Sequence, residues 1–194
     1  MSDKYLEILI RNNVENLYHF TCLNNLESIL ENGICNRKYM DTNGIKYEYT
    51  DKNRYDNQMG CISLSLDCTN KAMLNIKKQR YNNDWIVIQF DAKEILTNYY
   101  NDMYFCKYNA SSLSVIKILE ENKNYLNTPN AFNNMFDENK KTNFQAEILL
   151  EGNLPCDFIK KIYVNSLQTK LIVQQLINES KYNDIPVIIK KEMF

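Results

Sequence analysis

Seven stretches of the chain show either alternating hydrophobic and polar positions or a short unbroken hydrophobic run. The clearest alternation is "CISLSLD", where every second side chain is apolar, as in a strand buried on one side. "DWIVIQFD" is the strongest β-forming run because β-branched and aromatic residues dominate it. The predicted strands are residues 17–21, 61–67, 84–91, 103–108, 145–150, 158–164 and 185–191.

Helical spacing of apolar residues occurs between several of these stretches. In 22–33 the leucines and isoleucine recur at intervals of three and four, and Gly33 stands where a helix C-cap belongs. Residues 36–59 are polar and lack periodicity, which predicts a long exposed loop. Residues 123–143 also resemble a loop, with at most a turn of helix at 130–136. The other predicted helices are 70–81, 111–122 and 167–181.

This order of elements predicts one α+β domain spanning residues 1–194, because the strands are too scattered for a regular βαβ series. A chain of 194 residues with 44% hydrophobic and 24% charged residues is typical of a soluble globular protein. The N-terminal segment is too short and too charged for a signal peptide or anchor, and no run is long enough to span a membrane. We therefore expect a cytoplasmic protein with no membrane partner.

Charge and metal-binding residues narrow the classes of function. The net charge of −1 predicts no general attraction to polyanions, so any nucleic-acid surface must be a local patch. The six cysteines form no CxxC pair and there is one histidine, which argues against a zinc site. Without a secretory signal, disulfides are not expected.

The catalytic inventory is short. A histidine-based triad would have to use His19, and no GxSxG turn accompanies any serine. Four glycines and no GxxxxGK[ST] or GxGxxG exclude the common phosphate-binding loops. Glu147, by contrast, lies within the apolar run from Phe144 to Leu150. In a strand, such a carboxylate either faces solvent on the polar side or belongs to a site.

Four stretches follow one another over about residues 15–165: "LYHFTCLNNLESILENG", "CISLS", "YNAS" and "FQAEILLEGNLPCDFIKKI". The first contains Tyr-His-x-Thr and an Asn-Leu-x-Ser-Ile helix ending in Gly. The last contains Gln-Ala-Glu-x-Leu and an Ile-x-x-Ile strand. This ordered set of motifs resembles the DarT family of DNA ADP-ribosyltransferases, the toxins of DarT–DarG pairs, which opens and closes with these motifs.

The resemblance implies an ADP-ribosyltransferase fold with a small split central β-sheet flanked by short helices. Glu147 looks like the catalytic glutamate, and Arg54 like the catalytic arginine. The residues that would contact NAD are His19, Thr21, Asn25, Ser63 and Ser65. The residues that would contact DNA are Asn109, Lys140, Lys141, Phe144 and Gln145. Taken alone, each of these is typical of strand alternation, a turn or a solvated charge.

The implied activity is NAD-dependent transfer of ADP-ribose to thymine or guanine in single-stranded DNA. NAD is the donor substrate, no metal is implied, and an antitoxin of macrodomain or similar type would remove the modification. Before Gln-Ala-Glu the family often has Arg or Pro-Thr-Asp, whereas this chain has "KKTNF", which bears on base preference. Basic and aromatic residues at 77–81 could also hold a single strand.

The physical chemistry of this reaction needs few residues. Nicotinamide leaves NAD as a neutral molecule, so no acid is required, and the barrier lies in forming an oxocarbenium-like ribose cation. A fixed carboxylate stabilises that cation and can accept a proton from the acceptor base. Two alternatives remain: an RNA or protein acceptor, and a catalytically silent module that binds NAD or nucleic acid.

Overall fold

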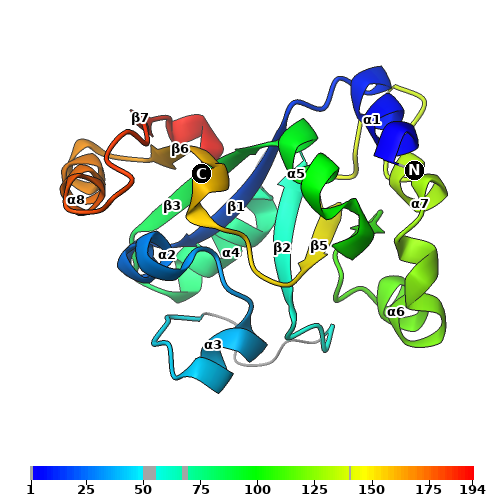
Figure 1. The fold of residues 1–194 in the computed structure, drawn as a ribbon, viewed down its shortest axis with the longest axis horizontal. Coiled ribbons are helices and arrows are strands. Elements are labelled where there is room, and N and C mark those ends of the chain that lie inside the picture. Colours follow the sequence, from blue (N-terminus) through cyan, green and yellow to red (C-terminus); the bar gives the residue numbers. More distant parts are fainter. Residues whose placement is uncertain (1, 50–55, 67–69, 140) are drawn as a thin grey trace.

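The computed structural model describes residues 2–49, 56–66, 70–139 and 141–194, and in this part of the chain seven strands form one sheet. Their order is β4-β5-β2-β1-β3-β6-β7 (Figure 1). All seven stretches predicted as strands are strands. They are β1 (Asn16–Cys22), β2 (Cys61–Leu66), β3 (Trp85–Asp91), β4 (Met103–Cys106), β5 (Glu147–Glu151), β6 (Ile159–Val164) and β7 (Val187–Ile189).

Helices surround this sheet, so the predicted α+β class is confirmed. The four predicted helices correspond to α2, α4, α6 and α8, and the predicted turn corresponds to α7. Three further helices, α1, α3 and α5, were not predicted. The bounds are α1 (Ser2–Arg11), α2 (Leu26–Asn32), α3 (Arg37–Asn43), α4 (Lys71–Arg80), α5 (Ala92–Tyr99), α6 (Leu113–Leu126), α7 (Pro129–Asn133) and α8 (Leu167–Asn178).

Two predictions differ from the structure for local reasons. The loop expected over 36–59 contains α3, which begins where the side chain of Asn36 accepts a hydrogen bond from Tyr39 N and ends at Gly44 in the left-handed region. This helix has no buried side chain, so it has no hydrophobic period to detect. Helix α6 continues four residues past its predicted end. Its backbone leaves the helical region at Asn122, the predicted end, and then turns helical again.

The sheet is split between its two central strands. β1 pairs with β3 over seven residues, but it pairs with β2 at only two positions, Leu17 with Leu66 and Tyr18 with Ser65. Nearer its start, β2 pairs with β5 instead, from Leu64–Ile148 to Cys61–Glu151. The second half of β1 and the first half of β2 therefore diverge. Every pairing is antiparallel except β6 with β7.

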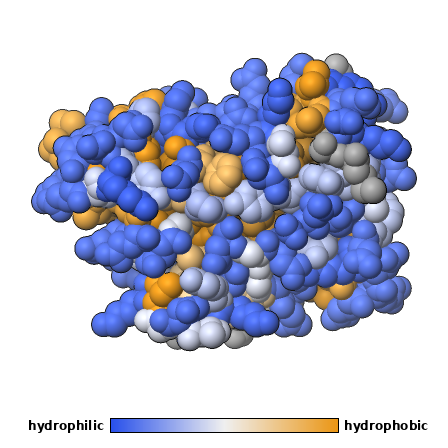
Figure 2. All heavy atoms as spheres, in the orientation of Figure 1, coloured by the Kyte–Doolittle hydropathy of each residue, from blue (hydrophilic) through white to orange (hydrophobic). Residues whose placement is uncertain are grey.

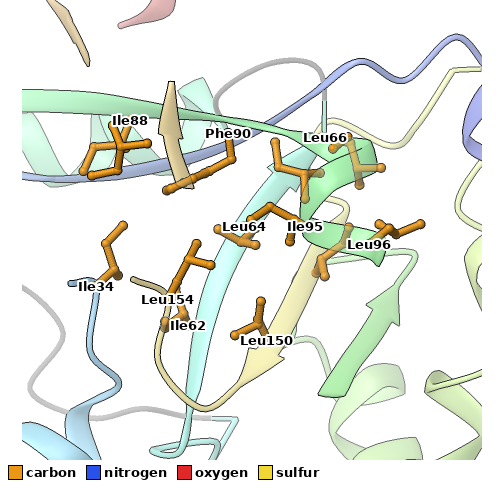
Figure 3. Close-up of a cluster of buried hydrophobic side chains, with 14 of the residues drawn as sticks. Ile34, Ile62, Leu64, Leu66, Ile88, Phe90, Ile95, Leu96, Leu150 and Leu154 are labelled. Atoms are coloured by element: carbon orange, nitrogen blue, oxygen red, sulfur yellow. The ribbon is translucent and has the colours of Figure 1, made fainter. Parts of the chain in front are cut away.

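One face of the sheet carries a single large hydrophobic cluster. Leu64 and Leu150 of the sheet pack there with Ile95 and Leu96 of α5, and Leu154 lies close to Ile34 and Ile62 (Figure 3). Side chains of α1, α2, α7 and α8 complete the cluster. This continuous core fixes the positions of the strands on both sides of the split.

The opposite face carries two smaller clusters in place of one. Leu74 of α4 packs in one of them with Tyr18 of β1, Val87 of β3 and Tyr163 of β6. Val115 and Leu119 of α6, with other members of the second cluster, cover β2, β4 and β5. The gap between these two clusters coincides with the split between β1 and β2.

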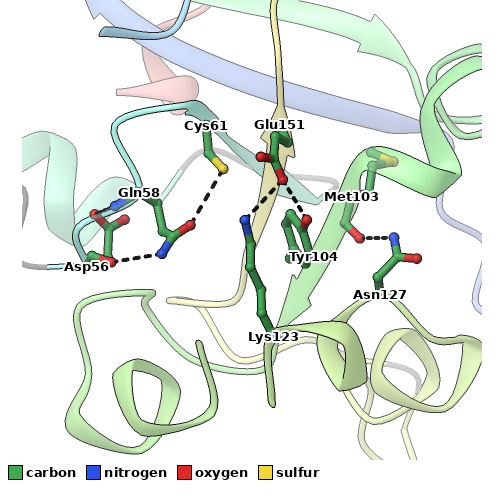
Figure 4. Close-up of polar contacts among 8 residues, drawn as sticks. All are labelled: Asp56, Gln58, Cys61, Met103, Tyr104, Lys123, Asn127 and Glu151. Atoms are coloured by element: carbon green, nitrogen blue, oxygen red, sulfur yellow. Dashed lines mark hydrogen bonds and ion pairs between the residues drawn. The ribbon is translucent and has the colours of Figure 1, made fainter. Parts of the chain in front are cut away.

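A polar network anchors α6 on the β4–β5 edge. Glu151 accepts hydrogen bonds from Tyr104 Oη at 2.5 Å and Lys123 Nζ at 3.0 Å (Figure 4). Lys123 also lies over the Tyr104 ring, 4.1 Å from its centroid. At the end of α6, Asn127 donates to the carbonyl oxygens of Tyr100 and Met103. The C-terminal part of α6 is thereby held beside the end of β5.

The visible face of the molecule is mostly hydrophilic, and its hydrophobic side chains gather in small separate patches (Figure 2). Among the helices of the described residues, none combines the length and hydropathy needed to cross a bilayer.

Candidate active site

A cavity of about 480 Å³ opens at the split in the sheet. Its volume lies within the usual range for small-molecule and cofactor sites. It receives side chains from β1, β2, α2, α4 and the start of β5, which are far apart in the sequence. The predicted site residues that line it are His19, Thr21, Asn25, Ser63, Ser65, Asn109 and Glu147.

Glu147 is the first residue of β5 and lines the cavity half-buried. Because strand residues alternate, Ile148 enters the large core while Glu147 faces the opposite side. Its Oε2 atom accepts a hydrogen bond from the backbone N–H of Ala110 at 2.9 Å. The carboxylate is therefore held in a fixed orientation at the cavity and does not point into bulk water.

A row of side chains crosses the sheet at the level of Glu147. Cys106 of β4 pairs directly with Glu147, and Tyr18 of β1 pairs with Ser65 of β2. Leu64 pairs with Ile148 on the antiparallel strand, so Ser65 and Glu147 occupy the next position of the same register. Burial, and secondly the nearby negative charge of Glu147, raises the pKa of the Cys106 thiol. Cys106 is thus a neutral packing residue next to the carboxylate.

His19 bridges the split directly beyond the last β1–β2 pair. Its Nδ1 atom lies 2.9 Å from the backbone oxygen of Ser63. A carbonyl oxygen can only accept, so this ring nitrogen must carry the hydrogen. The contact holds β1 and β2 at a fixed separation and orients the imidazole on the cavity wall.

Thr21 and Asn25 lie further along β1 and at the start of α2. The side-chain amide of Asn25 donates to Thr21 Oγ1 at 3.0 Å and to the backbone oxygen of Glu48 at 2.8 Å. In return, Glu48 N–H donates to Asn25 Oδ1 at 2.7 Å. Asn25 therefore connects the β1 wall of the cavity to the segment at 45–49.

Basic side chains line the same cavity. Lys77 and Arg80 come from successive turns of α4, and Arg37 comes from the start of α3. The sequence indicated residues 77–81 as a possible surface for binding single-stranded nucleic acid. In the structure, Lys77 is instead buried in the cavity wall. Asp56, Tyr47 and Tyr49 also line the cavity and were not predicted, because the polar stretch at 36–59 gives no periodic signal.

The remaining predicted DNA-contacting residues lie before β5, outside the cavity lining. Lys141, Phe144 and Gln145 are exposed, and Phe144 retains 65% of its surface. Two consecutive turns shape this segment. Asp137 Oδ1 accepts from Lys141 N at 2.9 Å, and Asn143 Oδ1 accepts from Gln145 N at 2.9 Å. Arg54 and Lys140 lie outside the described residues.

No group of three or more His, Cys, Asp or Glu side chains in the described ranges is arranged to hold a metal ion.

Comparison with solved structures identifies the fold. Thermosipho africanus DarTG in complex with ADP-ribose superposes with a TM-score of 0.63 at 18% identity, over 93% of this chain and 51% of that one. Thermus sp. 2.9 DarT in complex with NAD+ gives 0.59 at 14% identity, over 93% and 97%. The same Thermus protein with ADP-ribosylated ssDNA gives 0.60 at 12% identity, over 93% and 96%. This chain thus spans about half the length of the Thermosipho protein.

Sequence comparison with curated proteins finds no match. A family model described as "ssDNA thymidine ADP-ribosyltransferase, DarT" matches residues 18–194. The match includes both strands that border the split and the whole of β5, so it covers the cavity as well as the fold. The chain belongs to the DarT family of ssDNA thymidine ADP-ribosyltransferases.

Proposed function

We propose that the cavity at the split is the active site in which this DarT-family enzyme holds NAD and transfers ADP-ribose to a base of single-stranded DNA. The observation that carries this proposal is the Glu147 carboxylate, fixed by Ala110 N–H on the wall of a cavity of cofactor size. No step of the transfer requires a metal ion.

Glu147 acts on the reacting ribose. When nicotinamide departs, positive charge develops on the ribose C1′–O4′ unit, and an adjacent carboxylate stabilises it. Preorganised electrostatic groups of this kind contribute roughly 3–4 kcal/mol to a transition state. The new bond forms between C1′ and a base nitrogen, whose proton is lost as the bond forms, and Glu147 can accept that proton.

The walls on either side of Glu147 hold NAD. Ser65 lies near the reacting end, because it follows Leu64, whose partner Ile148 is the neighbour of Glu147, and Ser63 lines the same wall. His19 and Thr21 are expected to contact the adenosine part of NAD. Thr21 lies further along β1 and Asn25 directly precedes α2, and both side chains can bond the other ribose. The cations Arg37, Lys77 and Arg80 suit the diphosphate, which carries negative charge and accepts hydrogen bonds. For Arg54 the expected role is to hold the diphosphate or activate the acceptor.

DNA enters from the side of Asn109 and the two turns before β5. Asn109 lines the cavity beside Ala110, and Lys141, Phe144 and Gln145 are exposed in the segment that leads to Glu147. An exposed aromatic ring and an exposed cation in one short segment suit a single strand, whose bases stack on aromatic faces and whose phosphates attract cations. Lys140 is expected to contribute a phosphate contact there. The reacting base must be unpaired to reach Glu147.

Thymine is the expected base, in keeping with the description of the family, and guanine is the alternative. The Thermus DarT complexes with NAD+ and with ADP-ribosylated ssDNA support the assignment of donor and acceptor. The family context further suggests a toxin, acting in the cytoplasm, that is paired with an antitoxin able to remove the ADP-ribose. We assign the whole chain, 1–194, to one domain.

The test incubates the protein with labelled NAD and each of four homopolymeric DNA oligonucleotides, alongside RNA and protein pools. Transfer to oligo-dT, with release of nicotinamide, is the expected result. Transfer to oligo-dG alone would keep the activity and change the base. Labelling of only RNA or protein would contradict the DNA assignment. Binding of NAD with no labelled acceptor would indicate the catalytically silent module.

A further inference from the structure

Two lysines lie over aromatic rings on the face of the sheet that α4 covers. Lys190 Nζ is 5.5 Å from the centroid of the Tyr163 ring, and Lys78 Nζ is 5.8 Å from the centroid of the Phe194 ring. Tyr163 belongs to the hydrophobic cluster around Leu74, and Phe194 packs against the same cluster. The two cations are therefore held over one continuous apolar surface.

Two further lysines extend this group. Lys161 comes two residues before Tyr163 on β6, so both side chains project from the same face of the sheet. The pairing of Lys161 with Gln89 agrees with this placement, because Tyr163 Oη donates to Gln89 Oε1 at 2.5 Å. Lys191 follows Lys190 directly in the chain. We call these four residues the basic surface: Lys78, Lys161, Lys190 and Lys191.

The charges of the basic surface are not paired within the described part of the chain. Lys190 and Lys191 are exposed, and Lys78 and Lys161 are partly exposed. In the described ranges none of these four side chains forms an ion pair with a carboxylate, and Glu192 is the only acid in residues 187–194. The whole chain carries a net charge of −1, so this surface is a local excess of positive charge. Such a surface attracts polyanions.

The basic surface lies on the same face of the sheet as Glu147. Glu147 projects away from the large core, and Tyr163 packs in one of the two clusters on that opposite face. Helix α4 separates the basic surface from the cavity, since Lys77 lines the cavity whereas its neighbour Lys78 lies over Phe194. Strands β1, β3 and β6 lie between β2 and β7, which makes four strand spacings, or about 19 Å at about 4.8 Å each. A ligand at Glu147 has to span this distance to reach the basic surface.

Single-stranded DNA can span that distance. The strand continues on both sides of the base that enters the cavity, and at about 3.4 Å per stacked nucleotide, about 19 Å corresponds to about six nucleotides. Lysines contact phosphates as point charges and read no base. We propose that the basic surface binds phosphates of the DNA strand about six nucleotides from the reacting base, and that it sets the affinity for long strands without taking part in the transfer. This inference rests on the proposed function of the cavity.

The experiment compares a short and a long form, of about four and about twenty nucleotides, of the homopolymeric DNA that the wild type modifies. Only the long acceptor can reach the basic surface from Glu147. The variant is Lys190→Gln/Lys191→Gln, which removes two exposed charges. Lys181→Gln is the matched control, because Lys181 is also exposed and lies 4.9 Å from the Tyr182 ring centroid, next to α8 on the other face of the sheet. KM and kcat for labelled transfer are measured at several salt concentrations, with thermal unfolding in parallel.

Lys190→Gln/Lys191→Gln is expected to raise KM for the long acceptor by about fivefold or more, and to leave KM for the short acceptor and both kcat values unchanged. The slope of log KM against log salt for the long acceptor should fall by about 0.7 for each lost phosphate contact. Lys181→Gln should behave as wild type. An equal rise of KM for both acceptors, no rise for the long one, a matching rise with Lys181→Gln, or equal KM values of the two acceptors with the wild type would overturn the inference. Failure of the wild type to modify any DNA would instead overturn the proposed function.

Discussion

The Glu147 carboxylate accepts a hydrogen bond from the backbone N–H of Ala110, 2.9 Å away and 37 residues earlier in the chain. Ala110 belongs to the loop between β4 and α6, and α6 is tied to β4 and β5 through Glu151 and Lys123. The orientation of the proposed catalytic group therefore depends on how the β4–β5 edge is assembled. Glu147 thus has the proposed chemical role, whereas Glu151, four residues further along the strand, has a structural role.

Replacement of Glu147 by glutamine is expected to lower the rate of ADP-ribose transfer by about 10²- to 10³-fold, because the negative charge next to the ribose is lost. The amide oxygen of glutamine can still accept from Ala110 N–H, so the fold and NAD binding are expected to persist. Single-turnover labelling of oligo-dT with NAD, together with calorimetric NAD binding, measures both. Transfer at the native rate would remove the role assigned to Glu147.

The matched control for that variant is Glu151→Gln. Glu151 lies on the same strand and the same face, but its carboxylate bonds Tyr104 and Lys123 and does not line the cavity. The transfer rate of Glu151→Gln is expected to stay near that of the wild type. A loss as large as that of Glu147→Gln would mean that the rate reports the integrity of the sheet edge and not the charge at position 147.

Glu151 should also make stability depend on pH. Hydrogen bonds from Tyr104, and secondly from Lys123, lower the pKa of Glu151 in the folded state. Its stabilising contribution is therefore present above the unfolded pKa and is lost as pH falls through the folded pKa. Because half of the side chain is exposed, the contribution is expected to be under about 1 kcal/mol.

Denaturant unfolding of the wild type and of Glu151→Gln at neutral pH and near pH 3 tests this expectation. The wild type should be the more stable at neutral pH, and the difference should shrink at the acidic pH, where Glu151 becomes protonated. A difference that grows on acidification would show that the pKa of Glu151 is raised by folding and not lowered.

Gly33 joins α2 to the segment that pairs with Leu154. Its φ is +79°, and a Cβ atom there would lie 2.6 Å from the Leu154 carbonyl oxygen, which accepts a hydrogen bond from Ile34 N. Gly44 has a similar φ of +65°, but its Cβ would meet no described atom within 4 Å. Gly33→Ala should therefore cost more than the roughly 1–2 kcal/mol of left-handed strain expected for Gly44→Ala.

Thermal unfolding measures both alanine variants. In a chain of this size each kcal/mol corresponds to about 2–4 °C in Tm. Gly33→Ala should also weaken NAD binding, since Gly33 lines the cavity. Equal Tm values for the two variants would show that the Leu154 carbonyl yields without cost.

The rate at which Cys35 is alkylated can report whether NAD occupies the cavity. Among the five described cysteines Cys35 is the one that is partly exposed, and it lines the cavity. Burial raises the pKa of its thiol, so alkylation should be slow at neutral pH and should accelerate as pH rises. Saturating NAD is expected to slow this reaction further by covering the site.

Mass spectrometry of iodoacetamide-treated protein, with and without NAD, measures the protection. Cys156 is the internal control, because it is buried, lies outside the cavity lining, and has a pKa raised by burial to about 11. Alkylation of Cys35 at the same rate in the presence and absence of NAD would argue against NAD occupying this cavity.

The strands could be predicted from the sequence because each carries its own hydrophobic signal. Ile86, Ile88 and Phe90 are fully buried, and the alternation of β2 survives intact in the structure. Helices α1, α3 and α5 were not predicted. The amphipathic face of α3 is absent, and its ends are set by Asn36 and Gly44, which are equally common in loops.

The motifs also determined which family to expect, and several of their residues meet at one cavity. His19, Thr21 and Glu147 were named from the sequence. The first two belong to a motif on β1 and the third to a motif at the start of β5. Their residue types and order are local properties of the chain, so the sequence alone was enough to select them.

The sequence did not indicate where the two halves of the sheet separate. The two-residue pairing of β1 with β2, the His19 contact that spans the opening and the Ala110 hydrogen bond to Glu147 all join residues far apart in the chain. Nor did it reveal the hydrogen bonds to Glu48, which is one acid in a polar loop until Asn24, Asn25 and Asn83 converge on it. Such contacts depend on distances in space, which only the assembled core determines, whereas burial and strand formation depend on each segment's own pattern of side chains.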